Sequence, residues 1–184
     1  PEYVPSQFNY REDEKTTLEH TLGKEGSRNV HVQGRRGTGK THLLHTVLHR
    51  LPDEVNTCYV DCRACQTQYQ AFKQILRCIT QEPVSDGLHT SDLQRRIEER
   101  TGAVPTIIVL DEVDFLLQNQ GDDLLYYLSR TTNQIQTVTV SNQTTSLKES
   151  LEERTYSSLQ PRSVQLEPYN GEETYEVLLQ RAQN

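Results

Sequence analysis

The sequence predicts an α/β fold in which an open, mostly parallel sheet of five strands is covered by helices on both faces. Five short strand-like segments alternate with helix-like segments along the 184 residues, and this alternation is typical of parallel sheets. Residues 106–110 (TIIVL) are almost entirely apolar and β-branched, as expected of a strand that is buried on both faces. A glycine-rich segment, QGRRGTGKTHLL, lies between a strand and a helix, which is the position of a phosphate-binding loop.

Helix and strand patterns alternate regularly in the first eighty residues. Residues 11–22 have an amphipathic helical pattern, and the strand NVHVQ follows at residues 29–33. The glycine-rich loop leads into a helix that extends to about residue 50, where the next residues, Pro-Asp, indicate a turn. TCYVD at residues 57–61 is the second strand, and apolar residues at helical spacing then predict a helix over residues 69–79.

The second half of the chain predicts three more strands and four more helices. The breaker segment QEPVSDG ends the preceding helix, and Ser91 is a candidate N-cap for a charged helix that ends near residue 100. After it we expect, in order, the strand 106–110, a helix at 124–130, a strand at 136–140, a short helix at 146–152, a strand at 163–166 and a helix at 171–181.

The glycine-rich segment matches the phosphate-loop pattern G-x-x-x-x-G-K-[ST] without a mismatch. Glycines let the backbone direct successive N–H groups at phosphate oxygens, and the following helix adds its positive N-terminal end. We expect Lys40 to face solvent and reach the β- and γ-phosphates of ATP or ADP, and the Thr41 hydroxyl to hold Mg²⁺. The expected nucleotide-binding residues of the loop are Gly34, Arg35, Arg36, Gly37, Thr38, Gly39, Lys40 and Thr41.

A second motif, TIIVLDEVD, supplies the acidic groups that a phosphate loop requires. A parallel strand delivers the residues that follow it to the carboxyl edge of the sheet, where α/β folds bind ligands. We predict that Asp111 orients the Mg²⁺ shell together with Thr41, and that Glu112 polarises a water molecule for attack on the γ-phosphate. Asp114 is expected to be a helix cap or a surface carboxylate. The combination predicts a nucleotide-hydrolysing P-loop fold.

Two further polar residues favour hydrolysis over phosphoryl transfer to an acceptor. Asn142 lies just after the fourth predicted strand, where an amide can contact the γ-phosphate or the attacking water. Arg154 lies between two helix-like pieces on a predicted surface element and is a candidate arginine finger. A P-loop phosphotransferase remains the alternative from another class, because kinases of small molecules carry the same loop but usually lack the Asp-Glu pair.

Cysteines and histidines form two other patterns that could indicate chemistry. Cys62 and Cys65 make a C-x-x-C, but a structural zinc site needs a second pair nearby, so we favour free thiols. His42, His45 and His49 share one face of the helix after the loop. We interpret them as the polar face of that helix, opposite its leucines and valine.

Charge and composition restrict the classes of function. The formal net charge of −7 is unlike the basic footprint of a free-standing nucleic-acid binder. No apolar run approaches a membrane span and no signal-peptide pattern is present, so we expect a cytoplasmic protein without a membrane partner. The chain begins with Pro1 and contains no methionine, which predicts an excised part of a longer protein.

The sequence resembles the AAA+ ATPases, and within them the archaeal replication initiators related to the origin-recognition complex and the cell-division-control ATPases. The segments that carry the resemblance are GRRGTGKT, YVDCRACQTQYQAFKQIL, IIVLDEVDFLL, GDDLLYYLSR, TVSN and ERTYSSLQPRSVQLEPYN, in family order. The sequence departs from the family at Asp61, where asparagine is usual, and before Arg154, where proline or aspartate is common.

The resemblance implies roles for individual residues and segments. Asn142 would be sensor 1, Arg154 would act on a nucleotide in a neighbouring initiator subunit, and Tyr10 and Arg11 would lie over the adenine. Residues 1–168 would be the nucleotide-binding base, with an initiator-specific helical insertion at 62–100 that touches origin DNA. In that insertion LQRRIEERTG is the best local basic patch, with a solvated helix face as the alternative.

The resemblance also implies the domain boundary and the function. Residues 169–184 would begin the helical lid, while sensor 2, the rest of the lid and the winged-helix domain would lie outside the chain. The expected function is that of a slow, switch-like ATPase that recognises origins and helps load the replicative helicase. Another AAA+ or signalling ATPase acting on a protein substrate is the alternative within the same fold.

Overall fold

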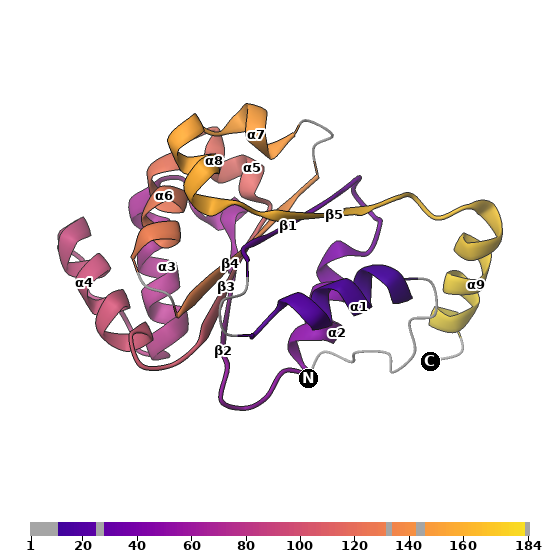
Figure 1. The fold of residues 1–184 in the computed structure, drawn as a ribbon, viewed down its shortest axis with the longest axis horizontal. Coiled ribbons are helices and arrows are strands. Elements are labelled where there is room, and N and C mark those ends of the chain that lie inside the picture. Colours follow the sequence, from indigo (N-terminus) through magenta and orange to yellow (C-terminus); the bar gives the residue numbers. More distant parts are fainter. Residues whose placement is uncertain (1–10, 25–27, 132–133, 143–145, 183–184) are drawn as a thin grey trace.

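A five-stranded parallel sheet forms the centre of the computed structural model, which describes residues 11–24, 28–131, 134–142 and 146–182 (Figure 1). The strand order is β2-β3-β4-β1-β5. All pairings in the described residues are parallel, which confirms the predicted sheet. The strands are β1 (Val30–Gly34), β2 (Asn56–Asp61), β3 (Thr106–Asp111), β4 (Ile135–Ser141) and β5 (Arg162–Leu166).

Helices cover both faces of this sheet, as predicted (Figure 1). One apolar cluster joins α1 and α2 to the sheet, and the other joins α3 to α8 to its opposite face. The helices are α1 (Glu12–Thr21), α2 (Lys40–Leu48), α3 (Gln68–Thr80), α4 (Thr90–Thr101), α5 (Val113–Leu117), α6 (Asp122–Arg130), α7 (Leu147–Ser150), α8 (Glu153–Leu159) and α9 (Gly171–Ala182), with a 3-10 turn at Cys62–Ala64.

The side chains of β3 pack into both apolar clusters of the domain. Ile108 and Leu110 belong to the cluster under α3 and α5, whereas Ile107 and Val109 belong to the cluster under α1 and α2. All six residues of β3 are buried, which confirms the prediction of a strand covered on both sides. Since alternate side chains of β3 pack into the two apolar clusters, burial of this strand stabilises the packing of helices on both faces of the sheet.

Several helices differ from the expected boundaries, and α5 was not predicted. The helix predicted at 146–152 is only the short α7, which ends at Ser150 because Leu151 turns to an extended conformation and buries its side chain. The Glu152 N–H donates to Asp122 at 2.9 Å, and a separate helix, α8, begins at Glu153. α4 begins one residue before Ser91, because His89 and Asp92 form a reciprocal capping box.

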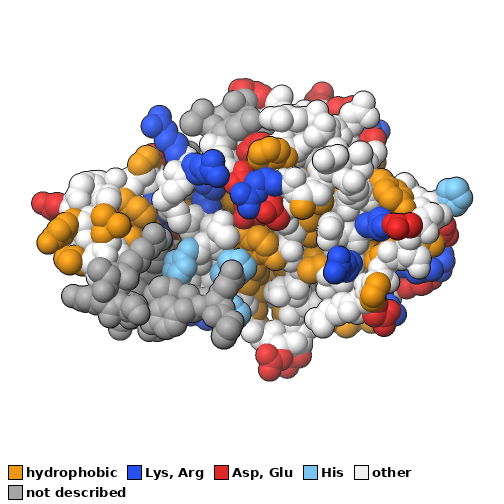
Figure 2. All heavy atoms as spheres, turned by 180° about the vertical axis from the view of Figure 1, so that it is seen from behind, with side chains coloured by type: hydrophobic (Ala, Val, Ile, Leu, Met, Phe, Trp, Pro, Cys, Tyr) orange, Lys and Arg blue, Asp and Glu red, His pale blue; other side chains and the backbone are white. Residues whose placement is uncertain are grey.

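α9 lies apart from the sheet layers, beyond the end of β5 (Figure 1). Its outward side chains include Tyr175, Leu178 and Leu179, which are 64, 58 and 41% exposed. Figure 2 shows apolar side chains gathered at that end of the molecule. In the part of the chain that the structure describes, no helix combines the length and apolarity needed to cross a bilayer.

Candidate nucleotide-binding and catalytic site

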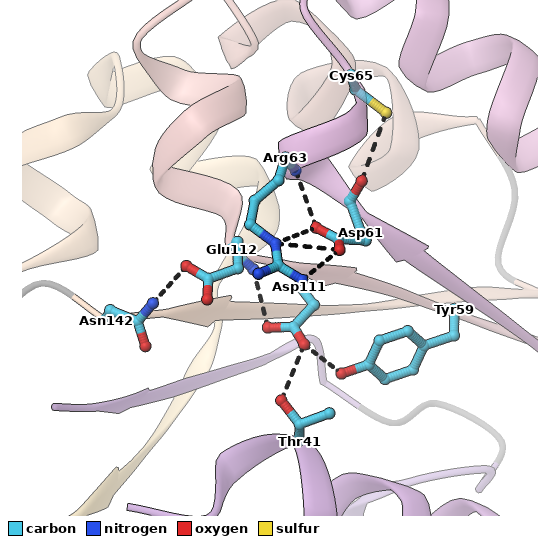
Figure 3. A network of polar contacts seen from close by, with 8 residues as sticks. All are labelled: Thr41, Tyr59, Asp61, Arg63, Cys65, Asp111, Glu112 and Asn142. Carbon is cyan, nitrogen blue, oxygen red and sulfur yellow. Dashed lines mark hydrogen bonds and ion pairs between the residues drawn. The ribbon is translucent and has the colours of Figure 1, made fainter. Parts of the chain in front are cut away.

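The predicted phosphate-binding and acidic residues meet at the carboxyl edge of the sheet. β1 leads into the glycine-rich loop, β3 ends at Asp111, and Asn142 directly follows β4. β4 lies between β1 and β3, so the three connections are neighbours in space. Figure 3 shows Thr41, Asp111, Glu112 and Asn142 in one network of polar contacts.

The glycine-rich loop has the backbone that the motif predicts. Gly37 and Gly39 have φ values of 84° and 86°, in the left-handed region that side chains disfavour. The loop is closed by Thr38, whose N–H and hydroxyl both donate to the Arg35 carbonyl, at 3.3 and 2.8 Å. The side chains of Arg35 and Arg36 are exposed. Gly39 is the N-cap of α2, so the loop ends at a helix N-terminus, which favours anions.

Lys40 is buried, and the expectation that it faces solvent was wrong. Its side chain is 6% exposed, and Nζ donates to the carbonyls of Gly34 at 2.6 Å and Arg35 at 2.9 Å. Burial lowers the pKa of Lys40, while nearby carboxylates, Glu112 foremost, act in the opposite direction. The loop wraps around the ammonium because a buried charge requires hydrogen-bond partners. The backbone of the loop therefore fixes the position of this charge.

Thr41 and Asp111 provide the oxygen ligands of a candidate Mg²⁺ site. The Thr41 hydroxyl donates to Asp111 Oδ2 at 3.0 Å, and the Glu112 N–H donates to Oδ1 at 2.9 Å. Asp111 is 8% exposed, which keeps its carboxylate in one place. A hydroxyl and a carboxylate oxygen beside a phosphate loop are the donors that Mg²⁺ prefers. These two residues therefore fit the predicted cation.

Glu112 and Asn142 are in direct contact. The Asn142 side-chain amide donates to Glu112 Oε2, so the residue after β4 is joined to the candidate water-polarising carboxylate. Glu112 has φ 55° and ψ 44°, a left-handed conformation that costs a non-glycine residue about 1–2 kcal/mol. Strained backbone of this kind concentrates at functional sites. The conformation turns the Glu112 side chain away from that of Asp111 (Figure 3).

Asp114 has a structural role that the sequence did not indicate. It lies in the first turn of α5 rather than at its cap, and it is half-buried. Its carboxylate accepts hydrogen bonds from the Ser141 hydroxyl at 2.7 Å and from the Asn142 N–H at 3.0 Å. The expectation of a helix cap or surface carboxylate was therefore wrong. Asp114 attaches the end of β4 to α5 and so fixes the backbone that carries Asn142.

Tyr59 is a site residue that the sequence reasoning missed. Its hydroxyl donates to Asp111 Oδ2, and its ring stacks on His45 with 4.6 Å between centroids and 18° between planes. Burial and the Asp111 carboxylate raise the pKa of Tyr59, so the hydroxyl remains a donor. His45 therefore does not simply belong to a polar helix face, and that interpretation was wrong for this residue.

Asp61 and Arg63 form a second group that was not predicted as part of the site. Asp61 pairs with Asp111 in the β2–β3 register. Its carboxylate binds the Arg63 guanidinium at 2.6 Å, and this arginine lowers the pKa of Asp61. The rule that indicated Asp111, an acidic residue at the end of a parallel strand, applies equally to Asp61 and could have found it.

The fold, the loop geometry and the acidic strand end agree with the comparison of this sequence with protein families. A family model described as an AAA domain matches residues 24–160. The chain belongs to this AAA family.

Relatives of this AAA domain include replication proteins from archaea. The chain is 31% identical to the ORC1-type DNA replication protein 1 of Sulfolobus acidocaldarius, over 99% of the chain and 49% of the relative. It is 32% identical to the ORC1-type DNA replication protein of Desulfurococcus amylolyticus, over 100% of the chain and 51% of the relative. The chain thus spans about half the length of the curated relatives it matches.

Solved structures show the same likeness. The structure of the Aeropyrum pernix ORC1 protein in complex with DNA superposes with a TM-score of 0.84 at 31% identity, covering all of this chain and 52% of that one. Cdc6p from Pyrobaculum aerophilum gives a TM-score of 0.82 at 20% identity, over 100% of this chain and 52% of that chain, which shows a shared fold. An AAA+ type P-loop fold is therefore established for the chain.

Arg154 lies on the surface of the AAA domain. It is in the first turn of α8, so its expected place between two helical pieces was wrong. Its guanidinium binds Asp123 at 3.0 Å and Glu152 at 2.8 Å, and it lies 5.0 Å from the centre of the Tyr126 ring. The side chain remains 55% exposed. Its role as a finger toward another subunit stays a prediction.

Arg11 contacts the phosphate loop from its outer side. It is 5% exposed, and Nη2 donates to the Thr38 carbonyl at 3.3 Å and to the Glu167 carbonyl. Its guanidinium lies 4.4 Å from the centre of the Tyr169 ring. Arg11 therefore links the loop to the segment before α9, while its predicted contact with adenine stays a prediction. Tyr10 lies outside the described residues.

Two further groups singled out in the sequence are the cysteines and the basic patch on α4. The four cysteines are free, with Cys58, Cys62 and Cys65 buried and Cys78 half-buried. On α4, Arg95 binds Glu99 at 2.7 Å. Glu99 thus neutralises part of the positive charge of the 62–100 segment, which is predicted to contact DNA.

Proposed function

We propose that this chain is the ATP-binding and ATP-hydrolysing core of a DNA replication initiator. The observation that carries the proposal is the convergence of the phosphate loop, the Thr41–Asp111 pair and the Glu112–Asn142 contact at one edge of the sheet. The names of the relatives, ORC1-type DNA replication proteins, direct the proposal to replication. The same core without such relatives would suggest only a nucleotide-hydrolysing domain.

Nucleotide binding follows from the loop and the start of α2. Backbone N–H groups of residues 34–41 would bind the phosphate oxygens, and the N-terminus of α2 would add favourable partial charge. Lys40 would exchange its carbonyl partners for the β- and γ-phosphates, since charge-assisted hydrogen bonds are the stronger ones. Thr41 and Asp111 would hold Mg²⁺, which neutralises charge on the phosphates when bound.

Hydrolysis requires a group that accepts a proton from water. Glu112 would act as this base, because its carboxylate lies beside the metal carboxylate but is directed elsewhere by the left-handed backbone. The Asn142 amide would hold Glu112 and the attacking water in line, since it already donates to Glu112 Oε2. Arg154 of one subunit would complete the site of its neighbour, so hydrolysis by a single chain should be slow.

The partners are proposals drawn from the relatives. One relative was solved in complex with DNA, and we propose origin DNA as a partner, with contacts from the 62–100 segment. Neighbouring initiator subunits would meet the exposed face of α8 that carries Arg154. We further propose that nucleotide state controls recognition of origins and loading of the replicative helicase.

Glu112→Gln tests the proposed chemistry. The variant is expected to bind Mg·ATP with the affinity of the parent chain but to release phosphate about 10²–10⁴-fold more slowly, because only the general base is neutralised. Equilibrium nucleotide titration and phosphate-release assays measure the two quantities. Hydrolysis at the parental rate would exclude Glu112 as the base. Transfer of labelled phosphate to an acceptor by the parent would support a phosphotransferase instead.

A further inference from the structure

The Asp111 carboxylate is held by more donors than the motif accounts for. In the described residues, its Oδ1 accepts the Glu112 N–H, and its Oδ2 accepts the hydroxyls of Thr41 and Tyr59. The first two donors belong to the motifs themselves. Tyr59 comes from β2, a different strand, and none of the proposed chemical steps uses it.

The sheet register explains how Tyr59 reaches this carboxylate. β2 and β3 pair so that Asp61 is opposite Asp111 and Tyr59 is opposite Val109. The Tyr59 backbone is thus two residues, about 6.6 Å, short of the strand end, and only a long side chain with a terminal donor spans that distance. Stacking on His45 of α2 fixes the ring in the required direction. Figure 3 shows the hydroxyl directed at Asp111.

If the Thr41 hydroxyl stopped donating to Asp111, the Tyr59 hydroxyl would be needed to hold that carboxylate. If Thr41 gives its oxygen to a cation, as proposed above, the remaining donors are the Glu112 N–H on one oxygen and the Tyr59 hydroxyl on the other. One donor on each oxygen fixes the plane of a carboxylate as well as its position. Mg²⁺ demands near-ideal octahedral geometry, so orientation of this ligand affects metal affinity directly.

We propose that Tyr59 is a positioning residue for the Mg²⁺ site, where its hydroxyl holds the Asp111 carboxylate in the orientation that the cation requires. The inference rests on the proposed nucleotide function of the same site. Partners that orient metal ligands typically contribute 10–100-fold to metal affinity. Tyr59 acts through Asp111 and is not itself a metal ligand.

Tyr59→Phe tests the proposal, because it removes the hydroxyl and keeps the ring that stacks on His45. ADP affinity is measured over a range of Mg²⁺ concentrations and again with the metal chelated. We expect the Mg²⁺ concentration that gives half of the maximal affinity gain to rise about tenfold or more, with metal-free ADP affinity unchanged. Tyr127→Phe is the matched control, since its hydroxyl donates to the Gln94 carbonyl and to Glu98 of α4, each at 3.0 Å, and not to Asp111.

The outcomes separate this inference from the function on which it rests. Equal Mg²⁺ requirements in Tyr59→Phe and the parent would overturn the role of Tyr59 and leave the nucleotide site intact. Equal weakening of the metal-free and metal-bound complexes would indicate a packing defect and would also overturn it. Failure of the parent chain to bind ADP more tightly with Mg²⁺ would contradict the proposed function itself.

Discussion

His31 should make the stability of this domain depend on pH between neutrality and mild acid. It is the second residue of β1, 1% exposed, with Nδ1 2.9 Å from the Thr139 hydroxyl. Its Nε2 is buried without a hydrogen-bond partner in the described residues. Burial lowers the pKa of His31 from 6.5 to about 4, against smaller opposing effects of Asp114 and Thr139. The imidazole is therefore neutral in the folded chain at neutral pH.

The sign and size of the effect follow from the two pKa values. Between pH 6.5 and about 4 the unfolded chain binds a proton at His31 that the folded chain does not, so the free energy of unfolding falls as pH falls. The full shift corresponds to about 3 kcal/mol, of which about 2 kcal/mol is lost between about pH 7 and about pH 5. That loss is a large share of the roughly 5–15 kcal/mol that stabilises a typical domain.

Denaturant unfolding of the parent and of His31→Gln at about pH 7 and about pH 5 measures this contribution. The variant cannot bind the proton, so the parent should lose about 2 kcal/mol more than the variant on acidification, while other titrating groups cancel in the comparison. His49→Gln is the control, because it removes an exposed histidine at the C-cap of α2 and leaves His31 in place. Identical pH dependence in the parent and in His31→Gln would refute the reasoning.

Two further predictions concern the nucleotide site. Lys40→Ala is expected to abolish measurable ADP binding in calorimetry while circular dichroism remains that of a folded chain, and unchanged affinity would contradict the loop assignment. Arg154→Ala is expected to leave nucleotide affinity of the dilute monomer unchanged but to slow phosphate release by an assembled form, up to about 10³–10⁵-fold. Weaker binding by the monomer would instead make Arg154 a contact within its own subunit.

The fold, the phosphate loop and the acidic pair of the candidate site could be predicted because each gives a signal in a short stretch of sequence. The five strands, the loop at residues 34–41 and the Asp-Glu pair each follow from a short pattern and from the rule that parallel strands present ligands at their carboxyl edge. The position of Asn142 just after the fourth strand predicted a contact with the γ-phosphate or the attacking water, and the structure shows its amide donating to Glu112.

Contacts between distant segments could not be predicted in the same way. Alternation along β2 gives the face of Tyr59 but not the reach of its hydroxyl to Asp111, which depends on register with β3. The hydrogen bond between Asp114 and the end of β4 depends on α5, a five-residue helix that is too short to show a helical periodicity of apolar residues. Lys40 was expected to face solvent because its charge was considered without the loop carbonyls that surround it.

Position 112 is one where the fold and the proposed chemistry favour different amino acids. The left-handed backbone there would suit glycine or asparagine better than glutamate, so glutamate carries a small conformational cost at this position. If Glu112 is the proposed base, its replacement by glycine or asparagine would leave the fold intact and would be detected only as lost hydrolysis. On that proposal, the residue at this position in diverged copies of the domain would indicate whether ATP hydrolysis is still under selection, even where the sheet and the loop are intact.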